Sequence, residues 1–120
     1  MSLDRWGFVR RNRSADAQQA LSVLDLPVLT IWGANDLNVD AHRNAQIYHE
    51  TLAGRHVATR IIVRPEATHG LLKACAYNWQ LTEDWTSFAV MRFLVEGRYA
   101  YAPGALEEIA SWILELSKNQ

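Results

Sequence analysis

A short apolar run between a proline and a glycine constrains the fold more than any other feature of this sequence. Pro27 precedes the run 28–32, which is rich in β-branched and other apolar residues, and Gly33 follows it. A continuous run of this kind is typical of a strand buried on both faces, as in a parallel sheet. We therefore expect an interior strand at 28–32, with Gly33 allowing the chain to leave its carboxyl end sharply.

A second strand and a connecting helix are expected next. Residues 58–63 form another apolar, β-branched run that Pro65 ends, and residues 39–52 between the two runs carry one weakly apolar helical face. Gly54 stands where that helix should stop. Two parallel strands joined through a helix make a right-handed crossover. The sequence therefore predicts the α/β class, with two parallel strands and flanking helices.

Two further helices follow from the helical spacing of apolar residues. Ser14 or Asp16 is expected to cap a first helix that runs to about Leu24. A last helix at 105–116 carries an aliphatic stripe beside Trp112, made of Leu106, Ile109, Ile113 and Leu116.

The region before the last helix is unusually aromatic. Residues 71–95 read as helical, with 83–94 the clearest helix. We treat 1–120 as a single domain and 71–102 as an aromatic insertion or cap-like segment. Its aromatic side chains are expected to pack as core or cap rather than to hold a cofactor. They are Tyr77, Trp79, Trp85, Phe88 and Phe93.

Two polar residues follow the two expected strands at the same edge of the sheet. Asp36 comes shortly after Gly33, and His69 lies in the turn after the second strand. The carboxyl ends of parallel strands meet at one edge, where functional carboxylates of open α/β sheets are found. A carboxylate that binds one ring nitrogen of a histidine fixes its tautomer and leaves the other nitrogen to face a nucleophile. Asp36 and His69 are therefore the candidate catalytic residues.

Each of these features alone has a plainer interpretation. Gly-x-x-Asp is most often a turn whose aspartate caps a helix, and an isolated His-Gly indicates less still. Asp40 is a second carboxylate in this region. We interpret it as the acid that starts the next helix, with the triad role as the alternative. The combination of spacing, strand context and a closing helix favours the catalytic interpretation.

In these residues the sequence resembles the α/β-hydrolase fold family, most closely over 26–70 and more loosely to Leu116. The matching features are a strand followed by Gly-x-x-Asp at 33–36, and His69 after the next strand, in the order acid then histidine. The resemblance implies that Asp36 is the triad acid and His69 the general base. It also implies a partial α/β-hydrolase-type three-layer sandwich.

Two parts of the family's pattern are missing from this sequence. No serine stands between the glycines of a nucleophile elbow, Gly-x-Ser-x-Gly, and the family's oxyanion-hole loop is not found either. The resemblance thus implies a C-terminal fragment of a serine hydrolase, inactive alone, whose parent cleaves an ester, thioester or peptide-like bond of a small molecule. The alternative is a non-catalytic binding or assembly module on the same scaffold. The serines are Ser2, Ser14, Ser22, Ser87, Ser111 and Ser117.

The expected sheet is too small to be stable by itself. A two-stranded parallel sheet has two open edges, and each edge presents backbone groups that can pair with another strand. We therefore expect this chain either to belong to a larger α/β domain or to self-associate through its exposed strand edges.

Composition argues against several classes of partner. With 12 Lys and Arg against 13 Asp and Glu, the net charge of −1 favours neither nucleic acid nor an anionic membrane. No apolar run approaches the roughly 20 residues that cross a bilayer. The polar start resembles no signal peptide, which favours a cytoplasmic protein. We interpret a basic patch near the start as a solvated face; it consists of Arg5, Arg10, Arg11 and Arg13.

No cofactor or metal is expected. His42, His49 and His56 recur every seven residues, but that spacing separates neighbours by about 10 Å along a helix, too far for one ion. No glycine-rich phosphate loop is present, so a flavodoxin-like binder has no support. Cys75 is the single cysteine, and we interpret it as a small packed residue that forms no internal disulfide.

Overall fold

The structure is a computed structural model that describes Gly7 and residues 17–118. The described part contains α-helices (α), strands (β) and turns of 3₁₀-helix (η). In chain order these are α2 (Ala17–Ser22), β1 (Val28–Gly33), α3 (Ala41–Leu52), β2 (Thr59–Arg64), α4 (Ala74–Tyr77), η1 (Thr82–Asp84), α5 (Ser87–Glu96), η2 (Gly97–Ala100) and α6 (Ala105–Lys118).

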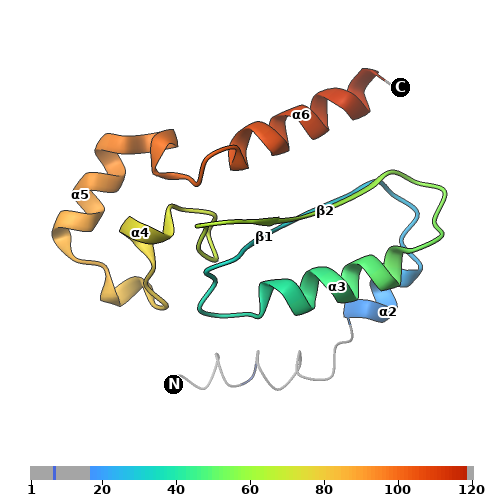
Figure 1. The fold of residues 1–120 in the computed structure, drawn as a ribbon, viewed down its shortest axis with the longest axis horizontal. Coiled ribbons are helices and arrows are strands. Elements are labelled where there is room, and N and C mark those ends of the chain that lie inside the picture. The colour runs from blue at the N-terminus through green and yellow to red at the C-terminus, as the bar shows by residue number, and fades with distance from the viewer. Residues whose placement is uncertain (1–6, 8–16, 119–120) are drawn as a thin grey trace.

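The two strands lie side by side and parallel, as predicted. Val28 pairs with Thr59 at one end of the sheet and Gly33 pairs with Arg64 at the other. Helix α3 packs on one face of the sheet and α6 lies over the opposite face (Figure 1). The chain is therefore an α/β protein with one strand–helix–strand unit.

The strands are less buried than their sequence indicates. Every residue of β1 except Gly33 is only half-buried, and β2 has no fully buried residue. The prediction of strands buried on both faces is therefore wrong for this structure. The reason is that the described residues form a sheet of two strands, so each strand has an open edge.

Helix α3 begins where Asp40 caps it. The Asp40 carboxylate accepts a 2.9 Å hydrogen bond from the Arg43 amide, which satisfies one of the free amides in the first turn. This confirms Asp40 as the acid that starts the helix, although the helix begins at Ala41 and not at 39. Tyr48 places its ring 5.4 Å from that of Trp32, which joins the helix to β1.

Helix α6 is joined to β2 by Trp112 and three ion pairs, two made by Arg60 and one between Arg64 and Glu108 at 3.5 Å. The Arg60 guanidinium lies 5.0 Å from the centre of the Trp112 ring and contacts Glu108 at 2.8 Å and Glu115 at 2.7 Å. Trp112 and Ala105 are the buried residues of this helix. The expected aliphatic stripe is wrong at one position, because the Ile113 side chain is 59 % exposed.

The aromatic segment, residues 71–102, forms several short helical pieces rather than one long helix. Its main helix, α5, starts at Ser87 and not at 83, because the Thr86 hydroxyl caps it by accepting a 3.1 Å hydrogen bond from the Ala89 amide. The segment has a core of its own. That core contains Leu72, Tyr77 and Ala100, with Trp79, Trp85 and Phe93 packed against them.

Two predictions for the aromatic segment are wrong. Phe88 does not join the aromatic core, since it is 74 % exposed. Cys75 is exposed rather than packed.

The expected cap of the first helix at Ser14 or Asp16 and the N-terminal arginines lie outside the described residues. Within the described residues, no helix is long and apolar enough to cross a membrane.

Candidate active site

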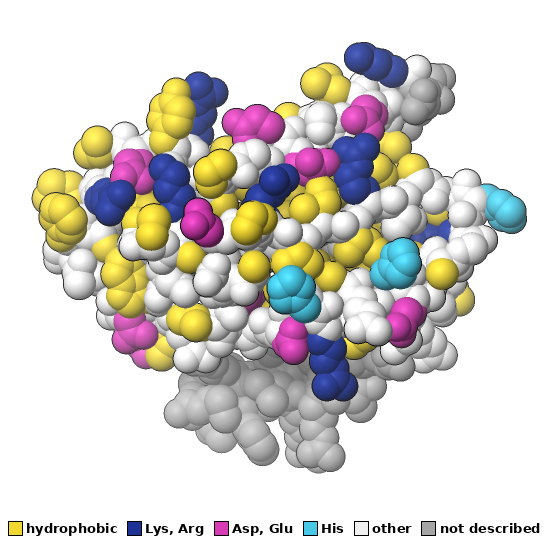
Figure 2. Space-filling view, in the orientation of Figure 1, with side chains coloured by type: hydrophobic (Ala, Val, Ile, Leu, Met, Phe, Trp, Pro, Cys, Tyr) yellow, Lys and Arg dark blue, Asp and Glu magenta, His cyan; other side chains and the backbone are white. Residues whose placement is uncertain are grey.

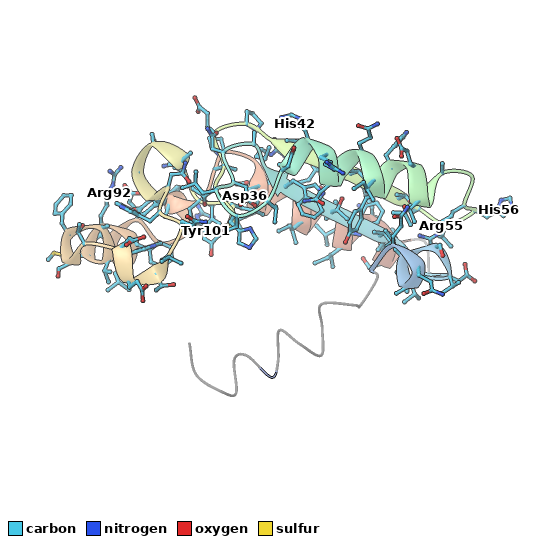
Figure 3. The ribbon with its side chains drawn as sticks, turned by 90° about the horizontal axis from the view of Figure 1, so that it is seen from below. Asp36, His42, Arg55, His56, Arg92 and Tyr101 are labelled. Carbon is cyan, nitrogen blue, oxygen red and sulfur yellow. The ribbon has the colours of Figure 1, made fainter. Side chains whose placement is uncertain are left out.

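Asp36 is held in the acid loop, residues 34–40, directly after β1. One oxygen of its carboxylate, Oδ1, accepts hydrogen bonds from the amides of Asn38 at 2.7 Å and Val39 at 3.2 Å. The Asp36 amide itself donates to the carbonyl of Gly33 at 3.1 Å. These bonds fold the loop around the carboxylate, whose side chain is only 2 % exposed. Figure 3 shows Asp36 between the strands and the aromatic segment.

His69 is presented by the histidine loop, residues 65–72, directly after β2. Thr68 braces this loop from within: its amide donates to the Leu72 carbonyl at 2.9 Å, and its hydroxyl accepts from the Leu72 amide at 3.1 Å. Leu71 has a φ of 60°, a left-handed conformation that costs a residue with a Cβ about 1–2 kcal/mol. The hydrogen bonds around it therefore hold a strained turn next to His69.

Gly33 allows the two loops to meet. A Cβ added to Gly33 would overlap the carbonyl oxygen of Thr68 and lie 2.5 Å from that of Ala67. The Asn35 amide donates to the Ala67 carbonyl at 2.9 Å across the same contact. The need for glycine at 33 thus comes from close backbone approach rather than from the sharp exit that the sequence indicates.

The two candidate residues are in direct contact. Nδ1 of His69 lies 2.7 Å from Oδ2 of Asp36, so the edge of the sheet brings together the two side chains that the sequence singles out. An ionised carboxylate only accepts hydrogen bonds, which assigns the proton to Nδ1 and leaves Nε2 as the basic nitrogen. The imidazole is 61 % exposed, and the described residues place no hydrogen-bond partner at Nε2. Nε2 is therefore accessible to take a proton from another group.

The surroundings of Asp36 favour its charged form. Burial raises the pKa of the Asp36 carboxyl, but the hydrogen bonds from Asn38, His69 and Val39 and the charge of His69 outweigh burial, so the pKa is lowered from its ordinary value of 3.8. Asp36 is thus ionised at neutral pH and stabilises a positive charge on His69.

No serine among the described residues completes a triad with Asp36 and His69. Ser22, Ser111 and Ser117 donate to carbonyls of their own helices, and Ser87 is an exposed residue at the start of α5. Metal ligands do not gather in this part of the chain either, since no three His, Cys, Asp or Glu side chains lie close enough to hold an ion. Figure 3 shows His42 near the start of α3 and His56 in the loop beyond its other end.

The groups that hold the pair in place were not predicted from the sequence. The Asn38 and Val39 amides form an Asx-type turn with Asp36. An aspartate in a loop favours this turn, because its carboxylate can accept a hydrogen bond from the backbone two residues further on. The bracing role of the Thr68 hydroxyl has no comparable signal, because it depends on the path of the loop through Leu71. The Gln80 amide group also donates to the Leu37 carbonyl at 3.4 Å, a contact between segments far apart in sequence.

Comparison with known proteins found no relative. No protein-family model, no curated protein and no solved structure matches this chain.

The Gly33 contact predicts a specific pair of substitutions. Gly33→Ala should destabilise the protein by about 1–3 kcal/mol, because the added methyl group forces the strand end and the histidine loop apart. It should also break the hydrogen bond between Asp36 and His69. Urea unfolding measures the first effect, and the NMR signal of the His69 Nδ1 proton reports the second.

Gly70→Ala is the matched control for this experiment. A Cβ at Gly70 would meet no atom within 4 Å, although the residue is next to His69. Its effect on stability should stay within about 0.5 kcal/mol. Equal destabilisation by the two substitutions would contradict the role given to Gly33.

The lowered pKa of Asp36 predicts a pH dependence of stability. A carboxyl whose pKa is lower in the folded chain than in the unfolded chain adds stability above its ordinary value of 3.8, and that stability is lost as the pH falls through the lowered pKa. Asp36→Asn should cost about 1–3 kcal/mol at neutral pH, because buried hydrogen bonds to a charged acceptor are lost or weakened. The difference between the two proteins should shrink below about pH 4.

Urea unfolding of both proteins from about pH 7 to about pH 2.5 measures this difference. Carboxylates other than Asp36 titrate in both proteins, so their contribution cancels. A difference in unfolding free energy that stays constant over this range would contradict the assignment.

Proposed function

We propose that this chain supplies the acid and the histidine of a Ser-His-Asp triad in a serine hydrolase of the α/β-hydrolase fold family. The 2.7 Å contact between the buried Asp36 carboxylate and the exposed His69 imidazole carries the proposal. The position of both residues after parallel strands, in the order acid then histidine, supports it. Helices α3 and α6 lie on the two faces of the sheet, and we take this small α/β arrangement as one part of a larger layered domain.

In this function His69 acts as general base and then as general acid. Nε2 takes the hydroxyl proton of a serine as the serine oxygen attacks the acyl carbon of an ester, thioester or peptide-like bond. The same proton passes to the leaving group when the bond to it breaks, which leaves an acyl-enzyme. Water then repeats both steps and releases the acid. Asp36 keeps the imidazole in the required tautomer and stabilises its positive charge throughout.

The nucleophile has to come from residues outside this sequence. None of the described serines contacts His69, and no serine of the chain stands in a nucleophile elbow. The proposal therefore includes a serine on a strand-to-helix turn, together with the oxyanion-hole donors, in a segment that joins the open edge of the sheet.

This proposal predicts that the purified 120-residue chain does not hydrolyse a small chromogenic ester faster than its His69→Ala variant. Expressed together with a preceding coding sequence that contains the elbow serine, the protein should hydrolyse the ester and react with a fluorophosphonate. In that protein His69→Ala should lower kcat by about 10⁶-fold and Asp36→Asn by about 10⁴-fold. Exposed His42 is a matched control, and His42→Ala should leave the rate unchanged.

Two outcomes would contradict the proposal. One is turnover by the isolated chain that His69→Ala abolishes, which would place the nucleophile inside the 120 residues. The other is a preceding coding sequence without an elbow serine, which would favour the alternative function below.

A non-catalytic binding or assembly module is the second candidate, and the surface of α5 favours it. Phe88, Met91, Leu94 and Val95 lie along one side of this helix with exposed fractions between 63 % and 82 %. Figure 2 shows hydrophobic side chains at the surface over this end of the molecule. Apolar side chains exposed together in this way are typical of an interaction site.

Self-association through the strand edges is compatible with either function. Each strand has one partner among the described residues, so backbone groups on its other side remain available. Static light scattering at increasing concentration should give a mass above the 13.7 kDa of one chain. The double substitution Met91→Glu and Val95→Lys tests the apolar side of α5. Self-association should persist if the strand edges make the contact. It should be lost if α5 makes the contact.

A further inference from the structure

A hollow of about 150 Å³ opens beside His69. One wall is the acid loop, with Leu37 and Asn38, and the other is the aromatic segment, with Trp79 and Trp85. Leu72 is buried in its floor. The hydrogen bond from the Gln80 side chain to the Leu37 carbonyl joins the two walls directly. The hollow is therefore built by the same loops that hold the Asp36–His69 pair.

The rings of the aromatic wall pack against one another. The Trp85 ring stacks on Tyr77 with centroids 5.7 Å apart and lies 5.6 Å from the ring of Trp79. Tyr77 is 1 % exposed and donates its hydroxyl proton to Glu96 at 3.0 Å. Burial, and then this hydrogen bond, raise the pKa of Tyr77, so the ring stays neutral. A wall fixed before binding loses little conformational entropy when a ligand enters.

The size and charge of the hollow select one kind of ligand. A space of about 150 Å³ has room for a single benzene ring, although the lining here is mixed, with polar side chains beside the aromatic ones. No Lys, Arg, Asp or Glu lines the hollow, and its polar residues are neutral amides, Thr hydroxyls and His69. An anion would find no Lys or Arg in the lining, and the charge of Asp36 already balances a positive charge on His69. The hollow therefore favours a neutral group of about six carbons.

The larger groove of the described residues is chemically different. Its volume is about 450 Å³, it lies between η2 and α6, and its lining includes Lys73, Arg98 and Glu107. Neither Asp36 nor His69 belongs to it. A group bound there could not reach Nε2 of His69, whereas a group in the smaller hollow touches the imidazole itself.

We propose that the hollow beside His69 binds the apolar part of the substrate, a single aromatic ring or a short alkyl chain attached next to the scissile bond. The role of this binding in catalysis rests on the proposed function, whereas the binding itself does not. The substrate class is therefore small neutral aryl or short-chain esters, thioesters or amides. Long acyl chains and charged acids fit neither the volume nor the lining.

Benzyl alcohol tests the binding on the 120-residue chain. It carries one neutral ring and nothing that His69 can cleave. Titration followed by NMR should shift the indole NH signals of Trp79 and Trp85 and the ring signals of His69 along one saturable curve, with a dissociation constant on the order of 1 mM. Benzoate has the same ring and a negative charge, and it should bind at least about tenfold more weakly.

Two matched substitutions locate the site. Thr82 is an exposed residue on the rim of the hollow, and Thr82→Phe should fill the space with the protein's own ring and weaken benzyl alcohol binding at least about tenfold. Ser87 is also exposed but lies outside the lining, and Ser87→Phe should leave the dissociation constant unchanged. If Thr82→Phe does not fold, NOEs between the ring protons of benzyl alcohol and those of Trp85 and His69 decide the same question.

Shifts that do not saturate, equal effects of the two substitutions, or tighter binding of benzoate would each overturn the proposal. These outcomes are independent of turnover. Binding of benzyl alcohol in a protein whose hydrolase test fails would retain the site and reject the triad. Turnover of long-chain esters in a protein that does not bind benzyl alcohol would retain the triad and reject the site.

Discussion

The candidate site depends on a close approach between two backbones. The end of β1 can touch the histidine loop only because Gly33 has no side chain, and the hydrogen bond between Asn35 and Ala67 joins them there. With the loops this close, the side chains of Asp36 and His69 meet at 2.7 Å. If the two loops were further apart, the His69 imidazole and the Asp36 carboxylate would still lie at the same edge but could not form a hydrogen bond. The carboxylate would then no longer orient the imidazole.

Burial and exposure are divided between the two partners in a way that suits proton transfer. The Asp36 side chain is 2 % exposed and the His69 side chain 61 % exposed. Backbone amides fix the carboxylate, which binds only Nδ1 of the imidazole. It therefore orients the ring and leaves Nε2 free to react. The imidazole in turn presents Nε2 to the surface. One wall of that surface is aromatic, which allows water to be displaced from the region around the reacting bond.

Much of this arrangement could be predicted from the sequence, because parallel strands and their turns have strong local signals. The run 28–32 and the following Gly-x-x-Asp fix both a strand and the edge at which Asp36 lies, and the second strand fixes the edge for His69. Contacts between distant segments have no such signal. The Thr68 brace and the hollow beneath Gln80 depend on how the aromatic segment folds back on the acid loop.

Burial was harder to predict than secondary structure. Ile113 and Phe88 have the spacing of buried residues, yet both are exposed, because helical periodicity identifies an apolar side and not what covers it. The same applies to the half-buried strands, whose apolar character would suit a larger sheet. In each case the sequence indicates more apolar contact surface than the described residues provide.

The separate core of the aromatic segment has a consequence for motion. Leu72, Tyr77 and Ala100 form this cluster. Hydrogen bonds between Thr68 and Leu72 link the segment to the histidine loop, and the bond from Gln80 to Leu37 links it to the acid loop. A segment packed in this way can open as one cooperative unit while the sheet stays folded. Because the hydrogen bonds between Thr68 and Leu72 tie this segment to the histidine loop, its opening would release His69 together with the aromatic wall.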